Sequence, residues 1–188
     1  GWELNSNTVM LTGENAQHAR VLRLKAGETV LVCDGQGTEC LCEVVDAGEM
    51  KLNVLERRES TSEAAVRVSV YMAFPKADKL EHVIQKATEL GAYEIVAFPS
   101  ARCVSRPDEK SLKKKLERWQ KIAASAAEQS GRGRIPQVLV LDSFHAALSR
   151  ASEADRALMF YENEQAVTLK MALDGEYQTV SLLTGPEG

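Results

Sequence analysis

The chain has 188 residues, of which 44% are hydrophobic and 27% charged, with a formal net charge of −4. These values are typical of a globular protein with one large domain or two small ones. The negative net charge argues against a surface that binds nucleic acid non-specifically over most of its area. No run approaches the ~20 apolar residues that a membrane span needs, and the first residues lack the basic and apolar pattern of a secretion signal.

The first 65 residues favour short strands joined by tight turns. Alternating apolar residues predict strands, and the glycines of Asp34-Gly35-Gln36-Gly37 suit a hairpin turn. We expect a small β-barrel over 1–65. The polar stretch at 57–63 is expected to be the linker to the rest of the chain. The expected strands are 8–11, 29–33, 38–45 and 50–55, with a short helix over 14–22.

From Val66 the pattern changes to alternating strands and helices, which predicts a mostly parallel sheet covered by helices on both faces. The fold class is therefore α/β, or α+β overall, with a second domain over 66–188. The expected strands are 66–74, 94–98, 138–141, 157–161 and 179–183, and the expected helices 79–90, 111–129, 144–149 and 166–173, with Asp78 as a cap and Gly91 as a stop.

Cysteine and histidine spacing gives no metal or disulfide pattern. Cys33, Cys40, Cys42 and Cys103 form no C-x-x-C pair, and the three histidines are scattered. Reduced thiols in a cytosolic protein, and no metal, are the better interpretation. Neither a G-x-G-x-x-G motif nor a P-loop is present, so a dinucleotide fold or an NTPase is not favoured.

Positive charge is concentrated in one segment. Residues 1–65 carry 6 Lys/Arg against 11 Asp/Glu, whereas residues 102–134 carry 10 against 4, a net +6. This pattern predicts a local polyanion site, although the run Lys113-Lys114-Lys115 by itself is typical of a solvated helix face.

A helix rich in alanine ends at Gly131 and is followed by Arg132 and Arg134 before Pro136. Arginines at such an end either bind phosphate and base edges or only favour the helix dipole. If they bind RNA, replacing both with alanine weakens RNA binding and flattens its salt dependence without affecting any cofactor.

Five motifs occur in order along the chain: Lys79 to Gly91, Arg102-Cys103, Arg118-Trp119 to Ala123, Glu128 to Arg132 with Ile135-Pro136, and Thr184 to Gly188. In this order and at this spacing they resemble the bacterial RsmE-type 16S ribosomal RNA uridine N3-methyltransferases of the SPOUT superfamily. A sixth stretch, His18 to Arg23 with Gly27 and Asp34-Gly35, resembles that family's PUA-like barrel.

The resemblance implies S-adenosylmethionine as methyl donor, a homodimer, a trefoil knot that builds the cofactor pocket, and 16S ribosomal RNA or the assembled small subunit as substrate. With the charge pattern, it implies RNA contacts by Arg20, Arg23, Lys76, Lys79, Arg102, Arg106, Arg132 and Arg134. The expected cofactor-binding residues are Tyr161, Glu162, Leu183, Thr184, Gly185, Pro186, Glu187 and Gly188.

The sequence departs from the family's pattern at Ala101, where the family usually has an acidic residue, and at both ends. The family's opening basic segment is missing. The family continues for about fifty residues after the Thr184 to Gly188 motif, through the segment that closes the knot, and a chain that ends at Gly188 is expected to bind the cofactor only weakly. No residue is a clear general base.

Two alternatives remain: a non-catalytic RNA-binding module without affinity for S-adenosylmethionine, and a SPOUT methyltransferase that acts on transfer RNA.

Overall fold

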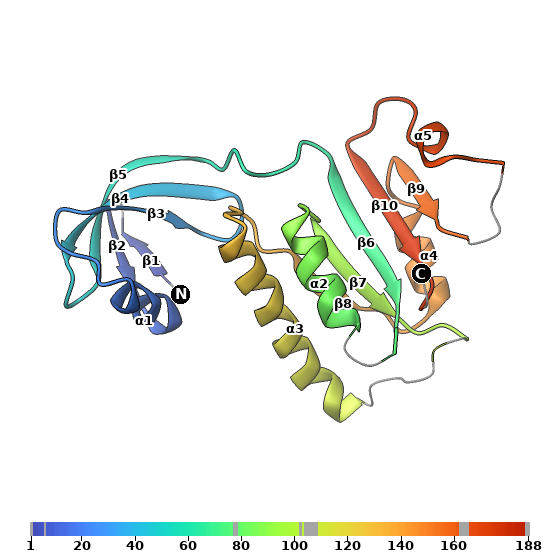
Figure 1. Cartoon of the computed structure of the whole chain (residues 1–188), viewed down its shortest axis with the longest axis horizontal. Helices are drawn as coiled ribbons and strands as arrows, with labels where there is room; N and C mark the ends of the chain where they lie inside the picture. Colours follow the sequence, from blue (N-terminus) through green and yellow to red (C-terminus); the bar gives the residue numbers. More distant parts are fainter. Residues whose placement is uncertain are drawn as a thin grey trace. The chain divides into compact units, whose positions relative to one another are not determined.

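The computed structural model describes residues 2–5, 7–76, 79–101, 103, 109–161 and 166–186. The chain divides into two compact units, Gly1–Glu63 and Ala64–Gly188. Figure 1 shows their elements in sequence colours. Each unit has its own hydrophobic core.

The first unit is a five-stranded antiparallel sheet with one helix. The strand order is β1-β2-β5-β4-β3, with β1 (Trp2–Asn5) and β3 (Thr29–Cys33) at its ends. Helix α1 (Gly13–Val21) buries Ala16 and Ala19 against this sheet. The described strand pairs do not include one that joins β1 to β3, so barrel closure stays a prediction. The other strands are β2 (Thr8–Leu11), β4 (Thr38–Asp46) and β5 (Lys51–Glu59).

The expected linker at 57–63 is wrong in its first half, because β5 continues to Glu59. Arg58 lies opposite Glu39 of β4, and its Nε lies 3.3 Å from a Glu39 carboxylate oxygen. Glu39 is buried and also accepts a hydrogen bond from the Ser60 hydroxyl. The strand therefore continues through charged residues, because the buried Glu39 carboxylate needs the partners that Arg58 and Ser60 provide.

The second unit is built on a five-stranded sheet in the order β8-β7-β6-β10-β9, and all four strand pairs are parallel. The prediction of a parallel α/β sheet is confirmed. Its strands are β6 (Arg67–Ala73), β7 (Glu94–Phe98), β8 (Gln137–Val140), β9 (Arg156–Met159) and β10 (Thr179–Thr184).

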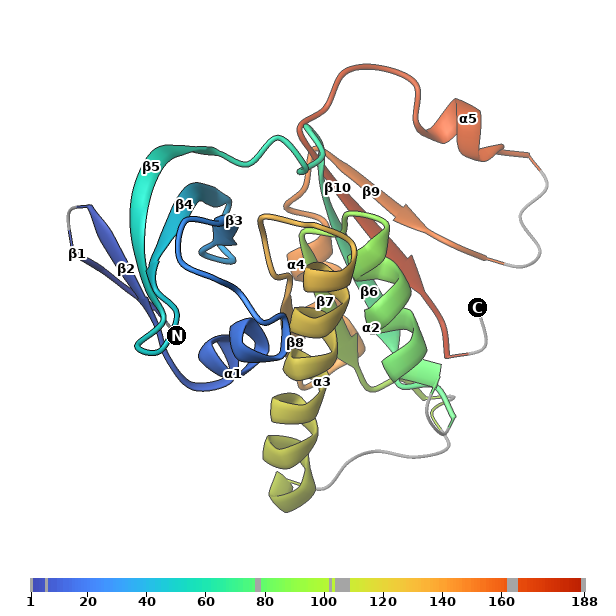
Figure 2. The same ribbon diagram turned by 60° about the vertical axis from the view of Figure 1, so that its left-hand side comes forward.

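Helices cover both faces of this sheet, as Figure 2 shows from a second side. Helices α2 (Lys79–Glu89) and α3 (Glu109–Gln129) enclose one core, in which Trp119 is buried. Helix α4 (Phe144–Ala151) packs on the other face through Ala147 and Ala151. Helix α5 is only Leu169–Ala172, shorter than predicted. The alanines of α3 thus serve close packing inside the protein: Ala123 is 0% and Ala127 1% exposed.

Three helices end in the same hydrogen-bonded turn, the Schellman motif. After α2, Gly91 N donates to Thr88 O and Ala92 N to Ala87 O; after α3, Gly131 N donates to Glu128 O and Arg132 N to Ala127 O. Both glycines have positive φ, +95° and +67°, which this turn requires. The predicted stops at Gly91 and Gly131 are confirmed, whereas Asp78, the expected cap of α2, lies outside the described residues.

Candidate functional site

The carboxyl edge of the parallel sheet contains a topological switch point. The chain builds β7 and β8 on one side of β6, then crosses to the other side, where β10 pairs with both β6 and β9. In open parallel sheets, ligands bind beyond the carboxyl ends of the strands at such a reversal. The loop that follows Thr184 leaves the sheet next to the end of β6 and is therefore at the expected position.

The predicted cofactor residues that the structure describes gather at this edge. Phe160 N donates to Leu183 O at 2.9 Å, which fixes the segment after β9 beside the end of β10. Thr184, Gly185 and Pro186 are half-buried, and Tyr161 is 63% exposed. Glu162, Glu187 and Gly188 lie outside the described residues.

Leu183 differs from its neighbours, because its side chain belongs to the core. It is 3% exposed and packs with Tyr71, Ala73, Val96 and Phe98 beneath the edge. Its contribution to a site is therefore its backbone and the support of the loop above it.

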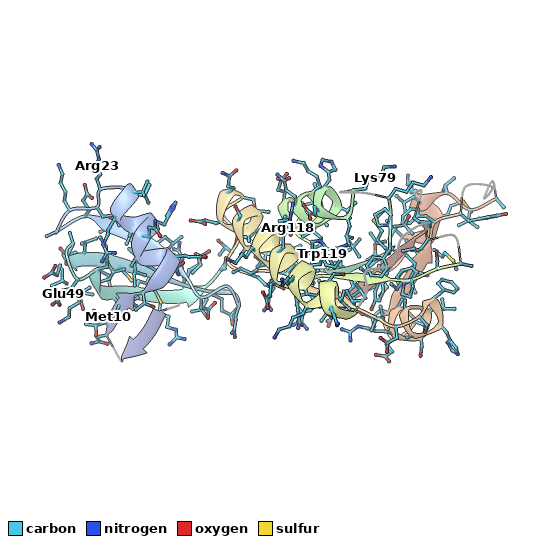
Figure 3. All side chains as sticks on the ribbon, turned by 90° about the horizontal axis from the view of Figure 1, so that it is seen from below. Met10, Arg23, Glu49, Lys79, Arg118 and Trp119 are labelled. Carbon is cyan, nitrogen blue, oxygen red and sulfur yellow. The ribbon has the colours of Figure 1, made fainter. Side chains whose placement is uncertain are left out.

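Two expected RNA-binding lysines lie at the same edge. Lys76 follows β6, and Lys79 is the first residue of α2; both are exposed. Figure 3 labels Lys79 at the end of its helix. Arg102 and Arg106 lie outside the described residues.

Cys103, next to Arg102, closes a tight turn after β7. Its Sγ accepts a hydrogen bond from Ser100 N at 3.1 Å, and Cys103 N donates to Ser100 O at 3.2 Å. The half-buried thiol also contacts the apolar cores on both faces of the sheet. These contacts give Cys103 a structural role in fixing the turn.

Arg132 is not at the surface, contrary to the expectation from the sequence. It is 7% exposed, and its Nη1 donates to Thr88 O at 3.0 Å and to Ala92 O at 2.8 Å. These are carbonyls at the end of α2 and just after it, which have few partners inside the helix. The guanidinium joins the ends of α2 and α3, so we leave Arg132 out of any RNA surface.

Arg134 lies at the amino edge of the sheet, opposite the loop that follows Thr184 and contains Gly185 (the glycine loop). Its guanidinium carbon is 5.1 Å from the centre of the Tyr93 ring, and that of Arg67 is 5.2 Å from the same ring. The three residues precede or begin β8, β7 and β6. Sequence reasoning missed Arg67 and Tyr93, because no local pattern shows that three strand starts meet.

Arg20 and Arg23 are both exposed at the end of α1. Arg23 N donates to Arg20 O and Leu24 N to Ala19 O, the same turn as after α2 and α3. Here the position occupied by glycine in the other two turns holds Arg23, with φ +55°. An L-residue in this conformation costs about 1 kcal/mol, so a side chain at this place indicates a use for it. Figure 3 shows Arg23 at the tip of the first unit.

Replacing Arg23 with glycine is expected to raise the free energy of unfolding by about 0.5–1 kcal/mol, because glycine removes the φ strain. Gly131→Ala is the matched variant in the same turn of α3. A Cβ there meets nothing within 4 Å, so only φ strain acts and stability should fall by about 1 kcal/mol. Urea unfolding measures both, and a less stable Arg23→Gly protein would refute the assignment of strain.

The described residues contain no group of three or more His, Cys, Asp or Glu side chains that could hold a metal ion. In the same part of the chain, no helix is long and apolar enough to cross a membrane.

Comparison with known proteins agrees with this architecture. Residues 62–188 match the family model described as "RNA methyltransferase domain", and residues 11–55 match the "RNA methyltransferase PUA domain". By these two matches, the chain belongs to the class of RNA methyltransferases that carry a PUA domain.

Relatives with assigned names identify the family within this class. A Bacillus subtilis protein named Ribosomal RNA small subunit methyltransferase E is 39% identical over 82% of this chain and 62% of its own length. One from Mycobacterium tuberculosis with the same name is 33% identical over 95% of this chain and 70% of its own. The chain belongs to the ribosomal RNA small subunit methyltransferase E family. It spans less than two thirds of the length of the Bacillus relative.

Solved structures share the fold. A Neisseria gonorrhoeae methyltransferase E, solved with bound S-adenosyl methionine, is 27% identical with a TM-score of 0.81 and covers 99% of this chain and 78% of that one. A Legionella pneumophila putative methyltransferase, also in complex with this cofactor, is 25% identical with a TM-score of 0.79, over 99% of this chain and 77% of that one.

Proposed function

We propose that the protein transfers a methyl group from S-adenosylmethionine to N3 of a specific uridine in 16S ribosomal RNA. The observation that carries this proposal is the glycine loop at the switch point of the parallel sheet, in a chain that belongs to the methyltransferase E family. The position of this loop is typical of a ligand-binding site, and the reaction and its cofactor are inferred from the relatives.

The residues at the carboxyl edge fit the proposed cofactor. Gly185 has no side chain, so its backbone amide and carbonyl can approach the nucleoside of the cofactor closely, and Pro186 stiffens the turn. Tyr161, 63% exposed, follows Phe160, whose backbone is bonded to Leu183, and offers a ring and a hydroxyl at the same edge. When bound, S-adenosylmethionine supplies the electrophilic methyl group. The finer proposal that Glu162, Glu187 and Gly188 complete the pocket, within a trefoil knot, rests on the family resemblance.

Uridine N3 carries a proton and is a poor nucleophile until that proton leaves. The protein must therefore hold the base in line with the methyl carbon and stabilise negative charge on the ring. The exposure of Lys79 at the same edge supports a role for this lysine in attracting the RNA backbone next to the target base. We assign Lys76, Arg102 and Arg106 to the same task, and Arg20, Arg23 and Arg134 to more distant contacts with the RNA. We name no general base.

We further propose, from the resemblance, that the protein works as a homodimer in the cytoplasm on naked 16S RNA or the assembled small subunit.

The substrate class is tested by incubating the intact protein with tritiated S-adenosylmethionine and, separately, 16S RNA, small subunits, 23S RNA and transfer RNA. Label is expected in 16S RNA or small subunits alone. Label in transfer RNA would favour the alternative, a SPOUT methyltransferase that acts on transfer RNA. RNA binding without cofactor binding would favour a non-catalytic module.

A further inference from the structure

The tip of α1 combines two exposed aliphatic side chains with arginines on both sides. Val21 is 73% and Leu22 58% exposed, between Arg20 and Arg23, which are exposed as well. Two adjacent aliphatic side chains exposed at one helix end form a small apolar patch, and a patch of this kind rimmed by polar residues is typical of an interaction site.

The tip is fixed in this shape by the turn that follows it. The left-handed backbone of Arg23 reverses the chain so that Leu24 returns to the core beside Ala19, while Val21 and Leu22 stay outside. Leu24 N donates to Ala19 O, which anchors the turn on a residue that is 4% exposed. A partner would thus meet a preformed surface and would lose little entropy in ordering it.

The charge around the tip identifies a polyanion as the partner. Arg20, Arg23 and Lys25 lie within six residues, and no Asp or Glu occurs from residue 15 to residue 27. This contrasts with the first 65 residues as a whole, which carry 6 Lys/Arg against 11 Asp/Glu. The tip also lies inside the segment that matches the RNA methyltransferase PUA domain, residues 11–55.

Aliphatic side chains distinguish unpaired from paired RNA. In an A-form duplex the base faces are stacked on one another, and the accessible groove presents hydroxyls and polar base edges. An unpaired or bulged nucleotide exposes its apolar face, against which Val21 and Leu22 can pack, as apolar wedges do between base steps in other complexes.

We propose that residues Arg20–Arg23 form an RNA wedge, in which Val21 and Leu22 contact the face of an unpaired base and the two arginines hold the flanking phosphates. This inference rests on the proposed RNA substrate and adds to it that the RNA has unstacked nucleotides at a place contacted by the first unit.

The test compares V21S/L22S with the matched variant V45S/L55S in the intact protein. Val45 and Leu55 are also exposed aliphatic residues of the first unit, at 52% and 51%, but each is followed by an acidic residue, Asp46 or Glu56, and neither lies between two arginines at a helix end. The probes are an RNA hairpin with a bulge that contains 2-aminopurine and the same hairpin fully paired, titrated at several salt concentrations.

For V21S/L22S, affinity for the bulged hairpin is expected to fall about tenfold, with the 2-aminopurine fluorescence response lost. Affinity for the paired hairpin should change less than about twofold, and the salt slope should stay the same because no cation is removed. V45S/L55S should behave as the parent on both RNAs.

Parent-like binding of the bulged hairpin by V21S/L22S, or equal losses on both hairpins, overturns the wedge while leaving the methyltransferase proposal intact. A change in oligomeric state in place of the RNA effect overturns it too and assigns the tip to a second copy of the chain. If the parent binds neither RNA, the wedge and the proposed substrate fail together.

Discussion

Replacing Arg132 with alanine is expected to lower the free energy of unfolding by about 2–4 kcal/mol. Arg132 is 7% exposed, and its Nη1 donates to two carbonyl oxygens, of Thr88 and Ala92, at 3.0 and 2.8 Å. Alanine would leave both oxygens without this donor and would open a cavity between the ends of α2 and α3. Urea unfolding followed by circular dichroism measures the loss.

Two further variants make this prediction specific. Arg132→Met keeps much of the apolar stem and should recover part of the packing but not the hydrogen bonds, so its stability should lie between those of the parent and the alanine variant. Arg134→Ala, two residues on, removes a half-buried arginine over the Tyr93 ring and should cost about 1 kcal/mol or less. An Arg132→Ala protein as stable as the Arg134→Ala protein would contradict the account.

The two arginines should also separate in RNA binding. At a temperature where both variants are folded, Arg134→Ala should weaken RNA binding and lower the salt slope by roughly 0.7–0.9. Arg132→Ala should leave that slope unchanged, because a guanidinium occupied inside the protein does not release counterions from RNA. The loss of RNA binding that the sequence predicts for the double alanine variant should therefore come from Arg134 alone, whereas the loss of Arg132 should lower stability.

Replacing Gly185 with valine is expected to reduce the affinity for S-adenosylmethionine by about 100-fold or more, with the fold intact. Gly185 follows β10 at the switch point, and in the proposed site a branched side chain there would compete with the nucleoside for space. Calorimetric titration measures the affinity, and the thermal transition serves as the check on folding.

Gly185→Ala is the graded control, since a single methyl group should cause a smaller loss. The valine side chain is β-branched, so any strain that it introduces at this position would also appear in the thermal transition and be recognised there. Unchanged affinity in a folded Gly185→Val protein would remove the glycine loop from the cofactor site.

Local patterns predicted the second unit well, most clearly at β7, which is buried on both faces. The run Glu94–Phe98 is buried throughout and was expected at the same bounds. The end of β5 was missed for the opposite reason: Arg57 and Arg58 look like a linker until Glu39, on the neighbouring strand, provides a buried carboxylate for Arg58. Pairing across strands, which a linear pattern does not show, decided that segment.

The candidate site was predicted at the level of loops but not of side chains. Parallel strands imply that their carboxyl ends share an edge, so the position of Gly185 and Lys79 followed from the strand–helix alternation. The role of Arg132 did not, because its partners Thr88 and Ala92 lie 44 and 40 residues away in sequence. An arginine after a helix has the same local pattern whether it faces inward or outward, and only the packing of α2 on α3 distinguishes the two.

Mass mapping of modified nucleotides in ribosomal and transfer RNA, from cells with and without the gene, measures whether the protein methylates one uridine of the small-subunit RNA. We predict that a single N3-methyluridine disappears from 16S RNA in cells that lack the gene and returns when the gene is restored. Unchanged methylation of 16S RNA, or a loss confined to transfer RNA, would contradict the account.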